Sequence, residues 1–142
     1  MTVRECLERP GVLRQAISLK RARIETLRRY SVRFSSGLSE VRVQASPDPA
    51  RMQVLLSEAA DEETEVLRLE EELSQALSEA ALLVSMLPDA KMIRLLEYRY
   101  LECMTWPETL LALDCGSSYA FKLHRKALAF LRSLPAFRGE TE

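Results

Sequence analysis

MQVLLSEAADEETEVLRLEEELSQALSEAALLVSML, from Met52 to Leu87, has the strongest periodic pattern in the chain. Its apolar residues recur at alternating steps of three and four, which is the spacing of a coiled-coil helix. The seam consists of Met52, Leu55, Ala59, Glu62, Val66, Leu69, Leu73, Ala76, Ala80, Leu83 and Leu87. Glu62 is its only polar member and is read as a residue that sets the register. We therefore predict one long helix whose apolar side is covered by another helix.

A second seam of the same kind runs from Leu13 to Phe34, ahead of the first. It consists of Leu13, Ile17, Lys20, Ile24, Leu27, Ser31 and Phe34, with two polar interruptions. The two predicted helices are joined by a loop at about 35–50 that contains two prolines, with a short extended piece at Val41–Val43. This loop is long enough for the chain to reverse. We predict an antiparallel coiled-coil hairpin.

The two predicted helices carry opposite charge. Residues 12–34 hold seven bases against one acid, Glu25, and residues 52–87 hold nine acids against one base, Arg68. The bases are Arg14, Lys20, Arg21, Arg23, Arg28, Arg29 and Arg33. They could form a nucleic-acid or membrane patch, but with an acidic helix next in the chain we expect them to pair internally. Exposed pairs contribute little stability, so their expected role is to select partner and orientation.

The predicted helices differ in length, roughly 35 Å for the first and 55 Å for the second at 1.5 Å per residue. The first helix would then cover only the beginning of the second. The later seam positions Ala76, Ala80, Leu83 and Leu87 need other cover. The C-terminal domain is one candidate for this cover, and a second copy of the chain, in a homodimer, is the other.

Pro88-Asp89 ends the long helix or begins a new one, since proline is tolerated only in a first helical turn. The next segment, AKMIRLLEYRYLECM, reads as a helix of roughly three to four turns. A short helix follows from Thr105 to about Leu113. Its start has a capping box, in which Thr105 and Glu108 satisfy each other's backbone N–H, and Pro107 lies in the first turn.

The last predicted helix follows a turn at Asp114-Cys115-Gly116, where both Asp114 and Gly116 are able to adopt positive φ. It is capped by Ser117 or Ser118 and runs to about Leu134. Its apolar side consists of Ala120, Leu123, Ala127, Leu128 and Leu131. Its solvent side consists of Tyr119, Phe121, Lys122, Arg125 and Lys126.

This last helix has four bases, one histidine and no acid between residues 117 and 132. A solvent-exposed helix usually carries both acidic and basic residues, because oppositely charged side chains four residues apart stabilise it. A basic helix after a short helix and a tight turn is typical of a reader of the DNA major groove. The N-terminal residues of such a helix meet base edges and its cations meet phosphates.

Composition excludes several classes of protein. The net charge is −1, no apolar run is long enough to cross a bilayer, and the first residues lack a signal-peptide core, so we expect a cytoplasmic protein with no membrane partner. Cys6, Cys103 and Cys115 lack paired spacing, which indicates reduced thiols, and Cys103 and Cys115 are expected to be half-buried. A metal site of Cys103, Cys115 and His124 has only weak support, and His124 is more simply a helix-surface histidine.

We expect that the protein is not an enzyme and binds no cofactor. His124, the only histidine, has no evident nucleophile or carboxylate partner, and the chain has no phosphate loop, metal spacing or paired-acid motif.

The segment LLEYRYLECMTWPETLLALDCGSSYAFKLHRKAL, residues 95–128, is similar to the fourth conserved region of bacterial sigma factors. The pattern there is L-x-x-R-Y-x-E-G-x-S-W-x-E-I-A, then a turn and a recognition helix ending in A-L. More closely, residues 13–134 resemble small sigma-like phage and prophage proteins related to the ArpU and RinA type late-gene regulators. That family has an R-V-Q-x-S loop, here Arg42–Ser46, and an L-H pair, here Leu123-His124.

The resemblance implies sequence-specific binding of double-stranded DNA in the control of phage genes, together with RNA polymerase. It points to Ser117, Ser118, Tyr119, Phe121, Lys122 and Arg125 as DNA-binding residues, and the basic face adds Lys126. Arg99, Thr105 and Trp106 match positions before and at the start of the supporting helix, and of these Arg99 and Thr105 are further candidates for DNA binding. We interpret Trp106 and Tyr100 as core residues.

Several departures from the family pattern bear on the predicted site. Thr109 and Leu110 stand where an apolar residue and an alanine are usual, so the angle between the two helices is open. Asp114 replaces a turn glycine. Phe121 replaces a polar residue, and would contact a thymine methyl group or be buried in a partner. The chain also lacks a promoter-melting region and should not open DNA unaided.

The sequence thus predicts an all-α protein. Residues 1–87 form the coiled-coil hairpin, 88–135 a three-helix sigma-region-four-like helix-turn-helix domain, and 136–142 a disordered tail. Two other functions stay open. Small terminase subunits of DNA-packaging machines also combine a helix-turn-helix with coiled coil, and a coiled-coil module could bind protein alone.

Overall fold

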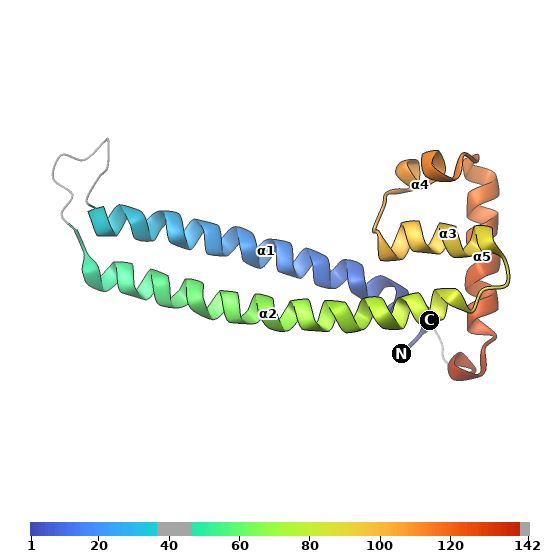
Figure 1. The fold of residues 1–142 in the computed structure, drawn as a ribbon, viewed down its shortest axis with the longest axis horizontal. Helices are drawn as coiled ribbons and strands as arrows, with labels where there is room; N and C mark the ends of the chain where they lie inside the picture. The colour runs from blue at the N-terminus through green and yellow to red at the C-terminus, as the bar shows by residue number, and fades with distance from the viewer. Residues whose placement is uncertain (37–46, 140–142) are drawn as a thin grey trace. The chain divides into compact units, whose positions relative to one another are not determined.

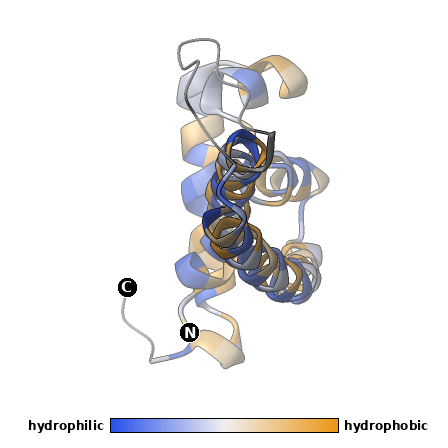
Figure 2. Cartoon of the chain, turned by 90° about the vertical axis from the view of Figure 1, so that its left-hand side faces the viewer, coloured by the Kyte–Doolittle hydropathy of each residue, from blue (hydrophilic) through white to orange (hydrophobic). Residues whose placement is uncertain are grey.

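The structure, a computed structural model, describes residues 1–36 and 47–139, and every regular element in these ranges is a helix. The predicted all-α class is confirmed. In chain order the elements are α1 (Val3–Ser36), α2 (Pro49–Ser85), α3 (Ala90–Leu96), the π-helix η1 (Glu97–Leu101), α4 (Trp106–Leu113), α5 (Ser117–Arg132) and the 3₁₀-helix η2 (Pro135–Phe137) (Figure 1). The colours of Figure 2 alternate between polar and apolar along these helices, as expected when each has one buried side.

Helix α1 begins ten residues before the predicted seam. Thr2 Oγ1 accepts a hydrogen bond from the Glu5 N–H (3.1 Å), and the Glu5 carboxylate accepts one from the Thr2 N–H (3.0 Å). This capping box starts the helix at Val3. The helix continues through Pro10, whose ring removes one hydrogen bond from its interior. The N-terminal turns were missed because Pro10 and Gly11 resemble a helix boundary.

The structure divides into two compact units, one of Met1–Leu13 with Glu72–Glu142 and one of Arg14–Glu71. We call them the core unit and the coil unit. The predicted domain boundary lies elsewhere, at residues 87 and 88. The difference arises because the first turns of α1 and the last turns of α2 pack with the C-terminal helices.

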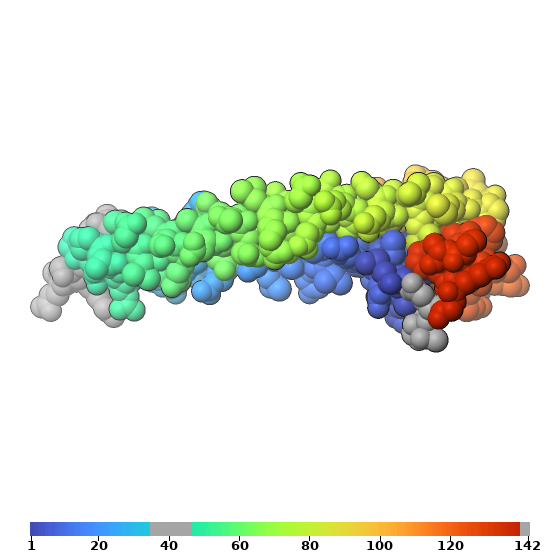
Figure 3. All heavy atoms as spheres, turned by 90° about the horizontal axis from the view of Figure 1, so that it is seen from below, coloured from blue at the N-terminus to red at the C-terminus, as the bar shows by residue number. Residues whose placement is uncertain are grey.

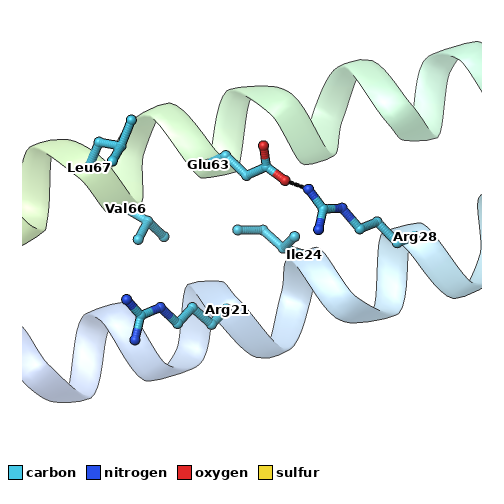
Figure 4. Close-up of a pocket in the computed structure, with 6 residues that line it drawn as sticks. All are labelled: Arg21, Ile24, Arg28, Glu63, Val66 and Leu67. Carbon is cyan, nitrogen blue, oxygen red and sulfur yellow. Dashed lines mark ion pairs between the residues drawn. The ribbon is translucent and has the colours of Figure 1, made fainter.

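In the coil unit, α1 and α2 lie side by side and run in opposite directions (Figure 1). Their seam residues are buried: Ile17, Ile24, Leu27 and Ser31 from α1, and Ala59, Val66 and Leu69 from α2. Figure 4 shows Ile24 and Val66 pointing into the space between the helices. The polar seam residues Lys20 and Glu62 meet each other, with Nζ and Oε2 3.1 Å apart.

Ion pairs line both edges of this seam. Arg21 pairs with Glu70 and Arg28 with Glu63, the latter drawn in Figure 4, while Arg23 lies 3.8 Å from Glu58. Along the edge with Arg21 and Arg28, the number of the α2 partner falls from 70 to 63 as the number in α1 rises, which agrees with the antiparallel direction. At least four of the seven bases of residues 12–34 therefore pair with acids of α2, as expected from the sequence.

The core unit buries apolar side chains from segments far apart in the sequence. Its fully buried members include Val3 and Leu7 of α1, Val84 of α2, and Leu95 and Leu131 of the C-terminal helices. The seam positions that needed cover are buried as well, and they are Ala76, Ala80, Leu83 and Leu87. In the core unit, residues of the first turns of α1 and of the C-terminal helices supply this cover.

The C-terminal segment also belongs to the core unit. Pro135–Phe137 forms η2, and Phe137 packs against the buried cluster. Figure 3 shows this segment, in red, against the last turns of α2. The predicted tail at 136–142 is therefore wrong for its first residues, because Phe137 has apolar surface to bury, and residues 140–142 lie outside the described part.

The predicted loop at 35–50 is shortened from both sides, since α1 extends to Ser36 and α2 begins at Pro49. The Asp48 carboxylate accepts a hydrogen bond from the Arg51 N–H (3.1 Å) and caps the new helix. The predicted extended piece at Val41–Val43 and the Arg42–Ser46 motif lie outside the described residues.

Candidate nucleic-acid interface

Helix α4 begins as its sequence predicts. The Thr105 hydroxyl accepts from the Glu108 N–H (3.3 Å), and the Glu108 carboxylate accepts from both the Thr105 N–H (3.3 Å) and the Thr105 hydroxyl (2.8 Å). Pro107 lies in the first turn. The predicted capping box is confirmed. Thr105 is exposed, but its hydroxyl is already used in holding the start of α4.

The turn between α4 and α5 uses one of its two candidate residues. Asp114 ends α4 in the left-handed conformation (φ 52°, ψ 52°), whereas Gly116 is extended (φ −81°, ψ 161°) and precedes α5 as its N-cap. The prediction that Ser117 or Ser118 caps α5 is wrong. Both serines lie in the first turn of the helix and are exposed. Gly116 takes the cap position without a side-chain hydrogen bond.

The two sides of α5 separate as predicted. Ala120, Leu123, Ala127 and Leu131 are buried in the core unit, and Leu128 is half-buried. The opposite side exposes the predicted set, which is Tyr119, Phe121, Lys122, Arg125 and Lys126. Within the described ranges, Lys122, Arg125 and Lys126 form no ion pair. Their charge is therefore uncompensated at the surface.

Two aromatic residues flank these cations. Phe121 meets Trp106 edge to face, with ring centroids 4.8 Å apart, and still exposes 41% of its surface. Tyr119 lies under the Lys91 ammonium group, which is 5.5 Å from its ring centroid. Lys91, in the first turns of α3, thus adds a cation to this face. Lys91 is not among the predicted residues because it is remote in sequence from α5.

Arg99 lies in η1 and is turned toward the protein. Its guanidinium lies over the Trp106 ring, 4.6 Å from the centroid, and donates to the Met104 carbonyl. Its Nε is buried and has no hydrogen-bond partner among the described residues. Arg99 and Thr105 thus hold the segment between η1 and α4, whereas the other predicted DNA-binding residues face outward from α5.

His124 is half-buried, so the prediction of a surface histidine is wrong. Its Nε2 lies 2.7 Å from the Tyr100 hydroxyl, and its ring stacks on Tyr100 and meets Trp106 edge to face. Burial, with Arg99 and Arg132 nearby, lowers the pKa of His124 to about 4. The ring is therefore neutral at pH 7, and its Nε2 shares a hydrogen bond with the Tyr100 hydroxyl. Tyr100 and Trp106 pack against the buried cluster, as predicted for core residues.

The two family departures in α4 face different surroundings. Thr109 is fully buried and its hydroxyl donates to the Thr105 carbonyl (2.9 Å), which satisfies its polar atom inside the helix. Leu110 is half-buried and lines a shallow surface depression with Pro107, Leu111 and Cys115.

The cysteines do not assemble a metal site. Cys6 is buried. The prediction that Cys103 and Cys115 are half-buried is confirmed for Cys115 and wrong for Cys103, which is exposed. Among the described residues no three histidine, cysteine or acidic side chains gather closely enough to hold a metal ion. Likewise, no helix in residues 1–36 and 47–139 combines the length and apolar character needed to span a membrane.

No protein-family model matches this chain, and neither does any curated protein or solved structure.

Proposed function

We propose that this chain is a sequence-specific double-stranded DNA-binding regulator of transcription. In this proposal α3, α4 and α5 form a helix-turn-helix domain with α5 as its recognition helix, and α1 and α2 form an antiparallel coiled-coil hairpin. The observation that carries the proposal is the outer face of α5, where Lys122, Arg125 and Lys126 are exposed and unpaired. The described α5 has no acidic residue to offset them.

The chemistry of this face suits a major groove. An α-helix fits the groove, and lysine and arginine bind guanine edges and phosphates. Ser117 and Ser118 in the first turn are small polar residues that can approach bases. Tyr119 and Phe121 bring apolar surface suited to thymine methyl groups. Trp106 backs the Phe121 ring and fixes its position.

Two backbone conformations support the proposed likeness to sigma region four. Cys103 stands where the quoted pattern has a glycine, and it adopts a positive φ of 56°. Asp114 stands at the turn glycine and has a φ of 52°. Non-glycine residues rarely adopt this conformation, so each position favours the residue that the pattern has there. From this likeness we also propose phage genes as the target and RNA polymerase as the partner.

The test is selection of DNA from a random duplex pool by the full chain, followed by fluorescence anisotropy with the selected duplex. Lys122→Ala/Arg125→Ala should weaken binding by roughly 10- to 100-fold and reduce the salt dependence of the affinity. The matched control is Arg23→Ala/Arg68→Ala, which removes the same charge from the coil unit and should bind nearly as the wild type does. Equal binding by the α5 variant and the wild type would refute the proposal.

The size of the particle in solution separates this proposal from DNA packaging. A monomer or dimer by light scattering agrees with a regulator. A closed ring of many subunits would instead favour a packaging subunit.

A further inference from the structure

A second cationic surface lies at the end of the coil unit near Ser36 and Pro49. It consists of Arg29, Arg33 and Arg51 with the rings of Tyr30 and Phe34, and we call it the end patch. Arg33 lies 5.1 Å from the Tyr30 ring centroid, and Arg51 of α2 lies 5.2 Å from that of Phe34 in α1. The patch therefore joins both helices.

The register of the ion pairs explains why this patch is uncompensated. Arg23 faces Glu58 across one edge of the seam. One heptad closer to the end of the coil unit, the same register places Tyr30 of α1 opposite Arg51 of α2. At this position α2 therefore has a base where it had the acid Glu58. Arg28 and Glu63 are the last pair on the other edge. Residues 49–57 of α2 contain no acid at all.

The charges of the patch have no acidic side-chain partner among the described residues. Arg29 reaches only the Thr26 hydroxyl (3.5 Å), and Arg33 and Arg51 stack on rings. The nearby acid Asp48 is engaged by the Arg51 N–H at the start of α2. Helix α2 has no acid in its first turn, where Arg51 meets the positive end of the helix dipole. A cation at this end does not stabilise the helix, so helix stability does not explain why Arg51 is there.

We propose that the end patch is a second DNA contact, which grips the phosphate backbone of a duplex without reading its sequence. This rests on the proposal that the chain binds double-stranded DNA. Guanidinium groups bind phosphate oxygens through paired N–H groups, and stacking on Tyr30 and Phe34 holds two of them in place. Contacts to phosphates carry no base readout, so the patch contributes affinity and salt dependence rather than sequence preference.

The experiment compares Arg33→Gln/Arg51→Gln with Arg21→Gln/Arg23→Gln in the full chain. Both variants lose two arginines from the coil unit, but only the first loses them from the end patch. Each is measured against random-sequence duplex and against the selected duplex over a range of salt. Circular dichroism melting confirms that both variants fold.

The end-patch variant should bind both duplexes roughly tenfold more weakly at low salt, with the same ratio between them. Its plot of log K against log salt should be flatter by roughly two, at nearly one per lost phosphate contact. The Arg21/Arg23 variant should keep the wild-type slope. An end-patch variant with the wild-type slope, with the slope of its control, or with a lost preference for the selected duplex overturns the inference.

The two proposals fail separately. If Lys122→Ala/Arg125→Ala binds as the wild type does while the end-patch variant is weak, the α5 proposal fails and the end patch stands. If the wild type binds neither duplex at low salt, both fail.

Discussion

Cys103 is held in a backbone conformation that an L-residue rarely adopts, at φ 56°. The residue is exposed, and its thiol donates a long, weak hydrogen bond to the Tyr100 carbonyl (3.6 Å). Cys103→Gly should raise the free energy of unfolding by about 0.5–1 kcal/mol, because glycine adopts positive φ without steric cost. Cys103→Val should lower it, since a β-branched residue fits this conformation worst. Urea denaturation of the two variants checks the order, and a more stable valine variant would contradict it.

His124 makes stability depend on pH. Its folded pKa of about 4 is below the unfolded value of 6.5, so the folded protein holds the neutral ring. The resulting stability is complete above pH 6.5 and is lost as pH falls from 6.5 through about 4, because protonation must then charge a half-buried ring. His124→Gln should remove this part of the pH dependence, about 1 kcal/mol after allowance for the exposed part of the ring.

Melting of the wild type and the His124→Gln variant at pH 7 and pH 4.5 provides the measurement. Carboxylates titrate in the same range in both proteins, so only the difference between the two curves counts. Parallel curves would show that the ring does not resist protonation.

At the scale of the helix, the pairing of α1 with α2 can be tested by exchanging charges. Arg28 and Glu63 face each other and are both exposed, so each alone contributes little. Arg28→Glu or Glu63→Arg should each lower the free energy of unfolding by about 0.5–1 kcal/mol through like-charge contacts. The double exchange should recover most of this loss. A double-mutant cycle with no coupling would argue against the pair.

The helices were predictable to different degrees. The heptad steps of 52–87 and the basic face of α5 are repeated many times, so both could be predicted from the sequence. The start of α1 was missed because Pro10 outweighed the Thr2 and Glu5 cap. The cap of α5 was misassigned because Ser117 and Ser118 have the better side chains, while Gly116 has the extended backbone that the position needs. Local propensity predicts the element but fixes its ends less well.

At the scale of the molecule, the outward cations of α5 could be predicted from the sequence. That the first turns of α1 belong to the same compact unit as the C-terminal helices could not. The neutral state of His124 depends on Tyr100, which is more than twenty residues away in the sequence. The inward direction of Arg99 depends on its place in η1, and a π-helical turn has no simple sequence signal. Similarly, the end patch arises because the register of the two helices places the last bases of α1 opposite a part of α2 that has no acidic residue. These features follow from packing between segments rather than from any one segment.

Leu7 tests whether the first turns of α1 are part of the core unit. The side chain is only 1% exposed and lies in the cluster that includes Val84 and Leu131. Leu7→Ala should therefore lower the free energy of unfolding by about 2–4 kcal/mol, from lost burial and the cavity left behind. The control is Val12→Ala, in the same helix but 64% exposed, which should change it by less than about 0.5 kcal/mol. If both variants melt alike, the first turns of α1 contribute no more than a solvated helix would, and the late seam of α2 needs another cover.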